Sequence, residues 1–97
     1  MLDQLSASDF DSLPDRRITL LDGERRIPLE VKEVRELPKR MERAAAPFTL
    51  TLRDPGARTA LAQGTFRFEH PTRGTLDLFT VPVGPDGEGM CYEIIFN

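Results

Sequence analysis

The chain has 97 residues, of which 39% are apolar and 30% are charged, and its formal net charge is −3. This size allows one core, so we expect a single domain over residues 1–97. The composition is that of a folded globular protein and excludes a disordered or membrane-embedded chain. No apolar run approaches the roughly 18–20 residues that span a bilayer, and we therefore expect no membrane partner.

The cysteine count and the first residues bear on localisation. Cys91 is the only cysteine, which excludes an internal disulfide and a cysteine-rich zinc site. The run Met1–Leu5 has neither the basic start nor the apolar core of a secretory signal. These features together predict a protein of the reducing cytoplasm.

The first predicted element is a short helix over residues 6–13. Ser6 or Ser8 can cap its free amides, and Phe10 and Leu13 form an apolar pair three residues apart. A helix of this length is not stable unless it is docked. We therefore expect Phe10 and Leu13 to plug one open end of the β structure.

A hairpin is predicted next. Strand one is expected over Arg17–Leu21, where apolar residues follow a charged start. Asp22 and Gly23 form a two-residue turn signal that leads to strand two, which begins near Arg25.

The apolar pattern of strand two changes parity along its length. Ile27, Leu29 and Val31 are odd-numbered, whereas Val34 is even-numbered. A one-residue insertion of this kind is a β-bulge, which increases the twist and turns a barrel corner. The alternative is a strand that simply ends near Lys32.

The segment between Glu36 and Ala46 breaks the period-two pattern, and we expect a mobile loop there. It holds the longest basic stretch, with Lys39, Arg40 and Arg43. These three residues form a candidate partner-binding loop. Nucleic acid is the weaker alternative as its partner, because the negative net charge disfavours contact with phosphates.

Four further strands are predicted in the second half of the chain. We expect them at Pro47–Arg53, Gly64–Glu69, Thr75–Val83 and Met90–Phe96. Each is bounded by turn-forming residues, and the first begins at a proline, where a sheet tolerates the missing donor.

The strand over Thr75–Val83 has apolar residues on both parities. Leu76 and Leu78 share one face, whereas Phe79, Val81 and Val83 share the other. We expect one of two arrangements. Either both faces are covered, as in a strand that crosses a barrel corner, or a second bulge lies near Leu78 and Phe79.

Six short strands joined by turns, without alternating strands and helices, predict an antiparallel meander. Closing the sheet would remove exposed edges, so the expected all-β fold is a small six-stranded antiparallel barrel or rolled sheet with a short N-terminal helix. A two-sheet β-sandwich is the alternative. If an edge stayed open, strand one or strand six could pair with a second copy and form a homo-oligomer.

The residues best suited to chemistry have simple structural interpretations. His70 is the only histidine, which excludes a multi-histidine metal site, and its place before Pro71 predicts a turn-capping or surface role. Cys91 has no histidine near it in sequence and is expected to be a small core residue. We therefore expect no enzyme activity, no catalytic, cofactor-binding or metal-binding residues, and no cofactor.

Polar and turn-forming residues at the strand ends are expected to hold the corners of the fold. These structural corner residues are Gln63, Gly64, His70, Pro71, Gly74, Tyr92 and Asn97. Asn97 is expected to anchor the last strand through its side chain or its carboxylate.

Several motifs occur together along the strands. They include Pro47–Leu50, Leu61–Phe66, Glu69–Pro71, Phe79–Val83 and Tyr92–Asn97. In these motifs the chain resembles a small uncharacterised bacterial family, described as a domain of unknown function. Relatives in that family are often encoded near phage-tail-collar-like proteins. The resemblance implies an accessory or structural part in a phage-tail-like or surface-fibre system, and it assigns no catalytic residue.

The leading functional expectation is a non-enzymatic protein-interaction or assembly module with a protein partner. The alternative is a small-molecule-binding β-barrel, although barrels of eight strands more often leave room for a ligand than barrels of six. The side chains expected to compete for the interior are Phe48, Leu50, Phe66, Phe68, Leu76, Phe79 and Phe96.

Overall fold

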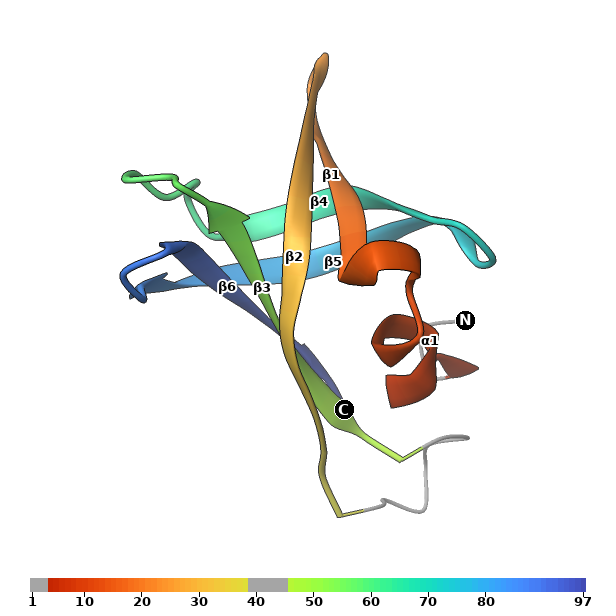
Figure 1. The fold of residues 1–97 in the computed structure, drawn as a ribbon. Coiled ribbons are helices and arrows are strands. Elements are labelled where there is room, and N and C mark those ends of the chain that lie inside the picture. Colours follow the sequence, from red (N-terminus) through yellow and green to blue (C-terminus); the bar gives the residue numbers. More distant parts are fainter. Residues whose placement is uncertain (1–3, 39–45) are drawn as a thin grey trace.

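The computed structural model describes residues 4–38 and 46–97. The predicted loop with Lys39, Arg40 and Arg43 lies outside these residues. In the described part, six antiparallel strands close into a barrel, and a short helix lies beside one end (Figure 1). The prediction of an all-β barrel with an N-terminal helix is therefore confirmed, and the barrel is closed rather than split into two sheets.

The helix and the strands follow the predicted order. Helix α1 spans Ala7–Asp11, and a 3₁₀ turn, η2, follows at Pro14–Arg16. The strands are β1 (Arg17–Asp22), β2 (Arg25–Glu36), β3 (Phe48–Pro55), β4 (Gly64–His70), β5 (Gly74–Pro85) and β6 (Gly89–Phe96). Their order in the barrel is β1-β2-β3-β6-β5-β4, and the pairing of β1 with β4 closes it. Strand β3 pairs with β6 and not with β4, so the predicted meander is wrong.

The register shift in β2 confirms the bulge that the change of parity predicted. It lies between Val31 and Glu33 in the ladder with β3. Before the shift, β2 pairs with β1 from Arg25 to Glu30, and from Glu30 onward it pairs with β3. The bulge therefore lies where one strand passes from one side of the barrel to the other, as expected for a corner.

The structure of β5 contradicts both expected arrangements, which were two covered faces and a bulge near Leu78 and Phe79. Leu78 and Thr80 are buried, whereas Phe79 is 54% exposed, so the interior position expected for Phe79 is wrong. The register shift of β5 lies between Pro82 and Gly84, beyond the predicted position. The inward parity of Leu78 simply continues to Thr80.

Thr80 can occupy this inward site because its polar atom has a partner. Its hydroxyl donates to the carbonyl oxygen of Leu78 at 3.0 Å, which removes the cost of burying an unpaired group. A polar residue thus takes the interior place, and the large apolar side chain of Phe79 faces outward.

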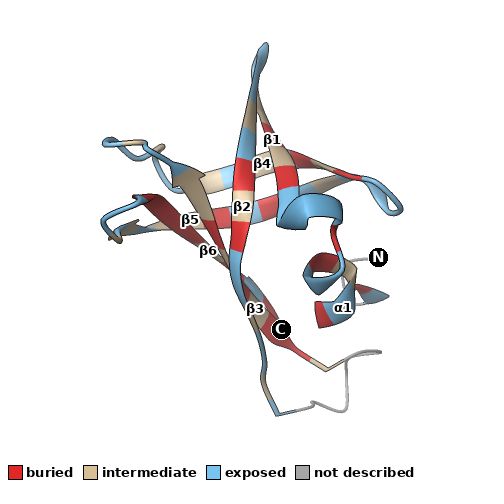
Figure 2. Ribbon diagram, in the orientation of Figure 1, coloured by how far each residue is buried: buried red, intermediate tan, exposed pale blue. Residues whose placement is uncertain are grey.

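The interior of the barrel is filled by side chains from every strand and from α1. Figure 2 shows buried residues alternating with exposed ones along the strands. Phe10, the one aromatic residue of α1, is fully buried, and its ring centroid lies 5.3 Å from that of Phe96 and 5.8 Å from that of Phe48. Leu13 lies beyond the end of α1 but is buried in the same core. The predicted plug is therefore confirmed.

Candidate functional site

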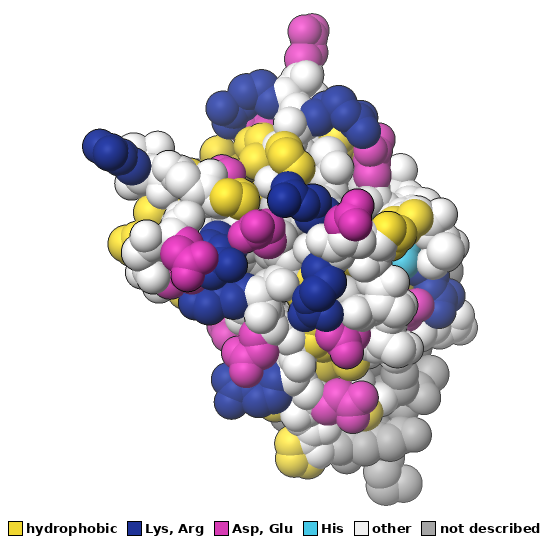
Figure 3. Space-filling model, viewed as in Figure 1, with side chains coloured by type: hydrophobic (Ala, Val, Ile, Leu, Met, Phe, Trp, Pro, Cys, Tyr) yellow, Lys and Arg dark blue, Asp and Glu magenta, His cyan; other side chains and the backbone are white. Residues whose placement is uncertain are grey.

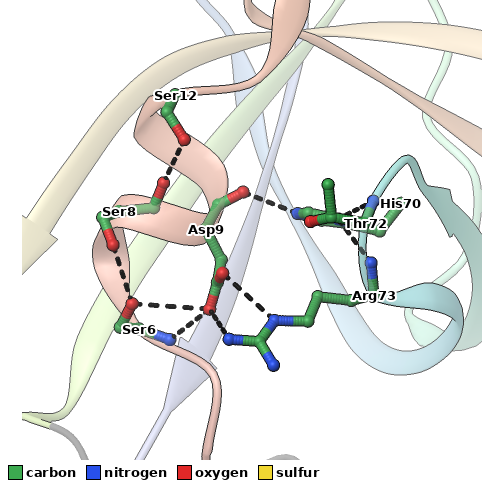
Figure 4. Close-up of polar contacts among 7 residues, drawn as sticks. All are labelled: Ser6, Ser8, Asp9, Ser12, His70, Thr72 and Arg73. Carbon is green, nitrogen blue, oxygen red and sulfur yellow. Dashed lines mark hydrogen bonds and ion pairs between the residues drawn. The ribbon is translucent and has the colours of Figure 1, made fainter.

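A group of polar contacts joins α1 to the turn between β4 and β5 (Figure 4). His70, the last residue of β4, is buried, and its Nδ1 accepts hydrogen bonds from the amides of Thr72 and Arg73 at 3.2 and 3.1 Å. Because Nδ1 accepts, the ring proton is on Nε2, which donates to the carbonyl oxygen of Asp9 at 2.6 Å. His70 therefore caps the turn and docks the helix.

The Asp9 carboxylate completes this helix anchor, which we define as Asp9, His70 and Arg73. It accepts from the Ser6 amide at 2.8 Å and from two guanidinium nitrogens of Arg73 at 3.1 and 3.2 Å. Partial burial raises the pKa of Asp9, but the Ser6 amide and the Arg73 guanidinium outweigh it and hold that pKa below 3.8. The polar atoms that face one another here serve to hold α1 in place.

Two further corner residues have defined contacts or conformations. Tyr92 is buried, and its hydroxyl accepts a hydrogen bond from the amide of Leu61 at 2.9 Å, which fastens the segment between β3 and β4. Gly74 follows the turn with a φ of 76°, a conformation that residues with a Cβ rarely adopt.

The other corner residues lie at strand ends. Gly64 is the first residue of β4, and exposed Gln63 precedes it. Pro71 is exposed in the turn that His70 caps. Asn97 is exposed after β6, and within the described residues its side chain makes no hydrogen bond.

A cluster of charged residues lies on the outer surface where β2, β3 and the β5–β6 turn meet. Arg53 Nη1 lies 2.6 Å from Asp86 Oδ2, and Arg53 Nε lies 3.0 Å from Glu30 Oε1. Lys32 Nζ lies 2.9 Å from the same Asp86 oxygen. Lys32, the Glu88 amide and Arg53 hold the pKa of Asp86 well below its ordinary value. Figure 3 shows positive and negative side chains interspersed over this side of the barrel.

Cys91 lies beneath this cluster and is buried, as predicted. Its Sγ is 3.9 Å from Lys32 Nζ, so it contacts the charged outer layer. Burial and the Asp86 carboxylate raise the pKa of the thiol. The thiol therefore stays protonated, which is the unreactive form. Sequence reasoning missed the cluster because strand pairing, rather than spacing along the chain, brings its members together.

An exposed apolar strip lies on the outer face of β5 and β6, and we define it as Phe79, Val81 and Ile95. Phe79 and Ile95 are each 54% exposed, and Val81 is half-buried. Together with Glu93 and Asn97, these residues line a hollow of about 270 Å³. Exposed apolar groups that gather in this way mark contact surfaces more often than single exposed residues do.

One part of the strip could have been found in the sequence. Tyr92, Ile94 and Phe96 share a parity and are buried, which turns Ile95 outward. The place of Phe79 required the structure, because the polar residue Thr80 hides the inward parity of β5.

The residues described in the two ranges contain no group of three His, Cys, Asp or Glu side chains arranged to hold a metal ion. The absence of a metal and of a cofactor stays a prediction. None of the helices described there is long and apolar enough to cross a membrane.

The strand order and the filled core define the class of the protein as a small closed antiparallel β-barrel. The chain belongs to the family described as domain of unknown function DUF6916, whose model matches residues 5–96. The resemblance to a domain of unknown function is thereby confirmed. Comparisons with curated proteins and with solved structures find no match.

Proposed function

We propose that the domain is a non-enzymatic protein-interaction or assembly module. The observation that carries this proposal is the apolar strip, where Phe79 and Ile95 stay more than half exposed although the barrel buries most of its large apolar side chains. Aromatic and aliphatic residues of this kind form the centres of protein–protein interfaces.

The residues suited to chemistry support a structural interpretation. His70 uses both ring nitrogens to hold a turn and a helix, and Cys91 is a buried thiol with a raised pKa. Neither lines the hollow beside the strip. These contacts favour a binding module over an enzyme.

The filled interior disfavours the alternative of a small-molecule-binding barrel. Leu20, Phe48 and Phe68 are fully buried and belong to the core that fills the space such a ligand would need. The hollow beside the strip is on the outside, where a partner with a broad surface can reach it.

The family resemblance supports a more specific form of the proposal. In this form the module acts in the bacterial cytoplasm as an accessory to a phage-tail-like or surface-fibre assembly. Co-expression with the products of neighbouring genes tests it, and we expect one of them to co-elute with the domain at a fixed stoichiometry. Independent elution of all of them would contradict this form.

Quantitative affinity capture tests the general proposal. The tagged domain, a Phe79→Thr/Ile95→Thr variant and a control variant, Asp22→Ser/Arg25→Ser, are incubated with lysate of the source cell. The control removes an exposed ion pair at the β1–β2 turn, and threonine keeps the β-propensity of the strip.

We expect one protein at fixed stoichiometry on the wild-type and control domains and its loss from the strip variant. The purified protein should then form the same complex by light scattering. Equal capture by all three domains, or no stoichiometric protein, would contradict the proposal.

A further inference from the structure

Strands β5 and β6 separate at the apolar strip. The ladder between them begins where Pro85 pairs with Met90 and ends where Val81 pairs with Glu93. Beyond this point β5 pairs only with β4, and β6 pairs only with β3 (Figure 1). Each strand therefore has one side without a strand partner in the described part of the chain.

The free side of β5 is long enough to hold another strand. It covers Gly74–Thr80, all of which pair with β4 on the opposite side. In an extended strand, backbone N–H and C=O groups point alternately to the two sides, so this stretch offers unpaired groups toward the gap. Such an edge is a template for an extended peptide.

The side chains beside the gap have the spacing that an added strand requires. Phe79 and Val81 are two residues apart on the outer face of β5, as are Glu93 and Ile95 on β6. Side chains at alternate positions of a strand point to the same face. A peptide in the gap would thus turn every second side chain toward the strip.

Charge indicates the chemistry of that peptide. Glu93 lines the hollow, is half-buried, and forms no ion pair within residues 4–38 and 46–97. By contrast, the other carboxylate beside the strip on β5, Asp77, is paired with Arg67 at 3.1 Å. A lysine or arginine on the occupant would supply the missing partner of Glu93.

We infer that an extended segment of a partner protein adds as a strand along Gly74–Thr80 of β5. Its apolar residues at alternate positions cover Phe79, Val81 and Ile95, and its lysine or arginine pairs with Glu93. This inference rests on the proposed function and specifies how the partner binds.

Selection from a phage-displayed library of random linear peptides tests the inference without a known partner. The wild-type domain is the bait, and the Phe79→Thr/Ile95→Thr variant removes peptides that bind elsewhere. We expect enriched peptides with apolar residues at every second position and at least one lysine or arginine. Enrichment of no peptide, or of peptides without this pattern, would overturn the inference.

A synthetic copy of the most enriched peptide then reports the binding mode. Hydrogen exchange should slow at backbone amides within Thr75–Thr80 when the peptide binds. N-methylation of alternate residues should weaken binding by about tenfold or more in one of the two patterns and leave it unchanged in the other, because only one side of an added strand donates to β5. Equal effects of both patterns, or protection confined to other strands, would refute strand addition.

The Glu93→Gln variant tests the charge. We expect affinity for the peptide to fall by about threefold to tenfold, with a weaker dependence on salt than for the wild type. Glu24→Gln is the matched control, because Glu24 is an exposed carboxylate without an ion pair among the described residues. Equal losses of peptide affinity in the two variants would contradict the proposed ion pair between Glu93 and the peptide.

Two results separate this inference from the proposed function. A captured partner that the strip variant loses, but that the peptide does not displace, would leave the interaction module standing and overturn strand addition. A wild-type dimer that becomes monomeric in the strip variant would show that a second copy covers the strip. This result would also overturn the inference that a segment of a partner protein binds there.

Discussion

Strands β2 and β6 each lose a neighbour along their second half, but the two gaps differ in what covers them. β2 pairs with β1 only up to Glu30, and helix α1 packs against β2 and β3. The Phe10 ring lies 5.8 Å from that of Phe48, which pairs with Glu36 at the far end of β2. β6 loses β5 after Glu93, and Phe79 and Ile95 beside that gap stay 54% exposed. Helix α1 thus covers the first gap. At the second gap, α1 reaches Phe96 at the end of β6 through Phe10, but the outer face around Phe79 and Ile95 stays open.

The covered gap shows what such a cover needs. Helix α1 has only five residues, too few to be stable alone. It is held by the apolar ring of Phe10 and by the helix anchor, which consists of Asp9, His70 and Arg73. Apolar burial supplies the free energy, and the hydrogen bonds fix the orientation. A segment that binds the open gap would need the same two components.

The largest expected effect on the free energy of unfolding comes from removing the apolar contact at the covered gap. Phe10→Ala removes a fully buried ring, and we expect it to lower the free energy of unfolding by about 3–5 kcal/mol. Phe79→Ala, at the open gap, should lower it by about 1 kcal/mol or less. Urea titration followed by circular dichroism measures both variants, and similar losses would break the comparison.

Disrupting the helix anchor should have the next largest effect on the free energy of unfolding. His70→Ala leaves the Thr72 and Arg73 amides without their acceptor and Asp9 without its donor. We expect a loss of about 1–3 kcal/mol in the free energy of unfolding. Hydrogen exchange should speed up first in α1 and in the β4–β5 turn.

Gln63→Ala serves as the control for His70→Ala, because Gln63 is an exposed corner residue. It should change the free energy of unfolding by less than about 0.5 kcal/mol. If His70→Ala were equally mild, α1 would be held by its apolar contacts alone.

A smaller effect is expected from the charged cluster, and it depends on pH. Lys32, the Glu88 amide and Arg53 depress the pKa of Asp86 below its ordinary value of 3.8. A group whose pKa is lower in the folded state stabilises that state fully above the unfolded pKa. This contribution is lost progressively as the pH falls from the unfolded pKa through the folded pKa. Wild-type stability should therefore decrease as the pH falls through about 4.

The Asp86→Asn variant isolates this contribution. It should be less stable than the wild type at neutral pH, and its urea midpoint should fall less between about pH 5 and about pH 3. Asp77→Asn, in an exposed ion pair with Arg67, should keep the wild-type slope. A parallel decline in wild type and Asp86→Asn would contradict the assignment.

The smallest expected effect sharpens the comparison at the open gap. Phe79→Thr/Ile95→Thr should change the free energy of unfolding by no more than about 1 kcal/mol, because both side chains are more than half exposed. Binding of an apolar dye to the folded domain should decrease. A loss well above this value would mean that the strip is already covered in solution, and light scattering would then show the second copy.

Much of the fold could be predicted because its signals are local. The β1–β2 hairpin, the bulge after Val31 and the inward parity of β3 all follow from residues near one another in the sequence. The two turn residues are Gly23 and Glu24, one position later than the predicted Asp22 and Gly23. Alternation reports which side chains share a face of a strand. Alternation fails where a polar residue points inward. Thr80 is buried in this way, and Phe79, which was expected inside, is therefore on the outer face.

The sites depended on contacts that no local pattern contains. His70 reaches the carbonyl of Asp9 across 61 positions of the sequence, and Arg53 reaches Asp86 across 33. The sequence identified His70 as a turn residue because Pro71 follows it, but it could not indicate which helix the ring holds.

The sequence by itself determined the six strands, the helix that must dock, and the turns that make neighbouring strands antiparallel. The tertiary structure alone decided that β1 closes on β4, that β6 lies between β3 and β5, and that β5 and β6 then diverge. The reason is that alternation specifies faces, whereas strand order depends on which edges can pair while the shared core is filled. The exposed strip at the gap is a consequence of that order.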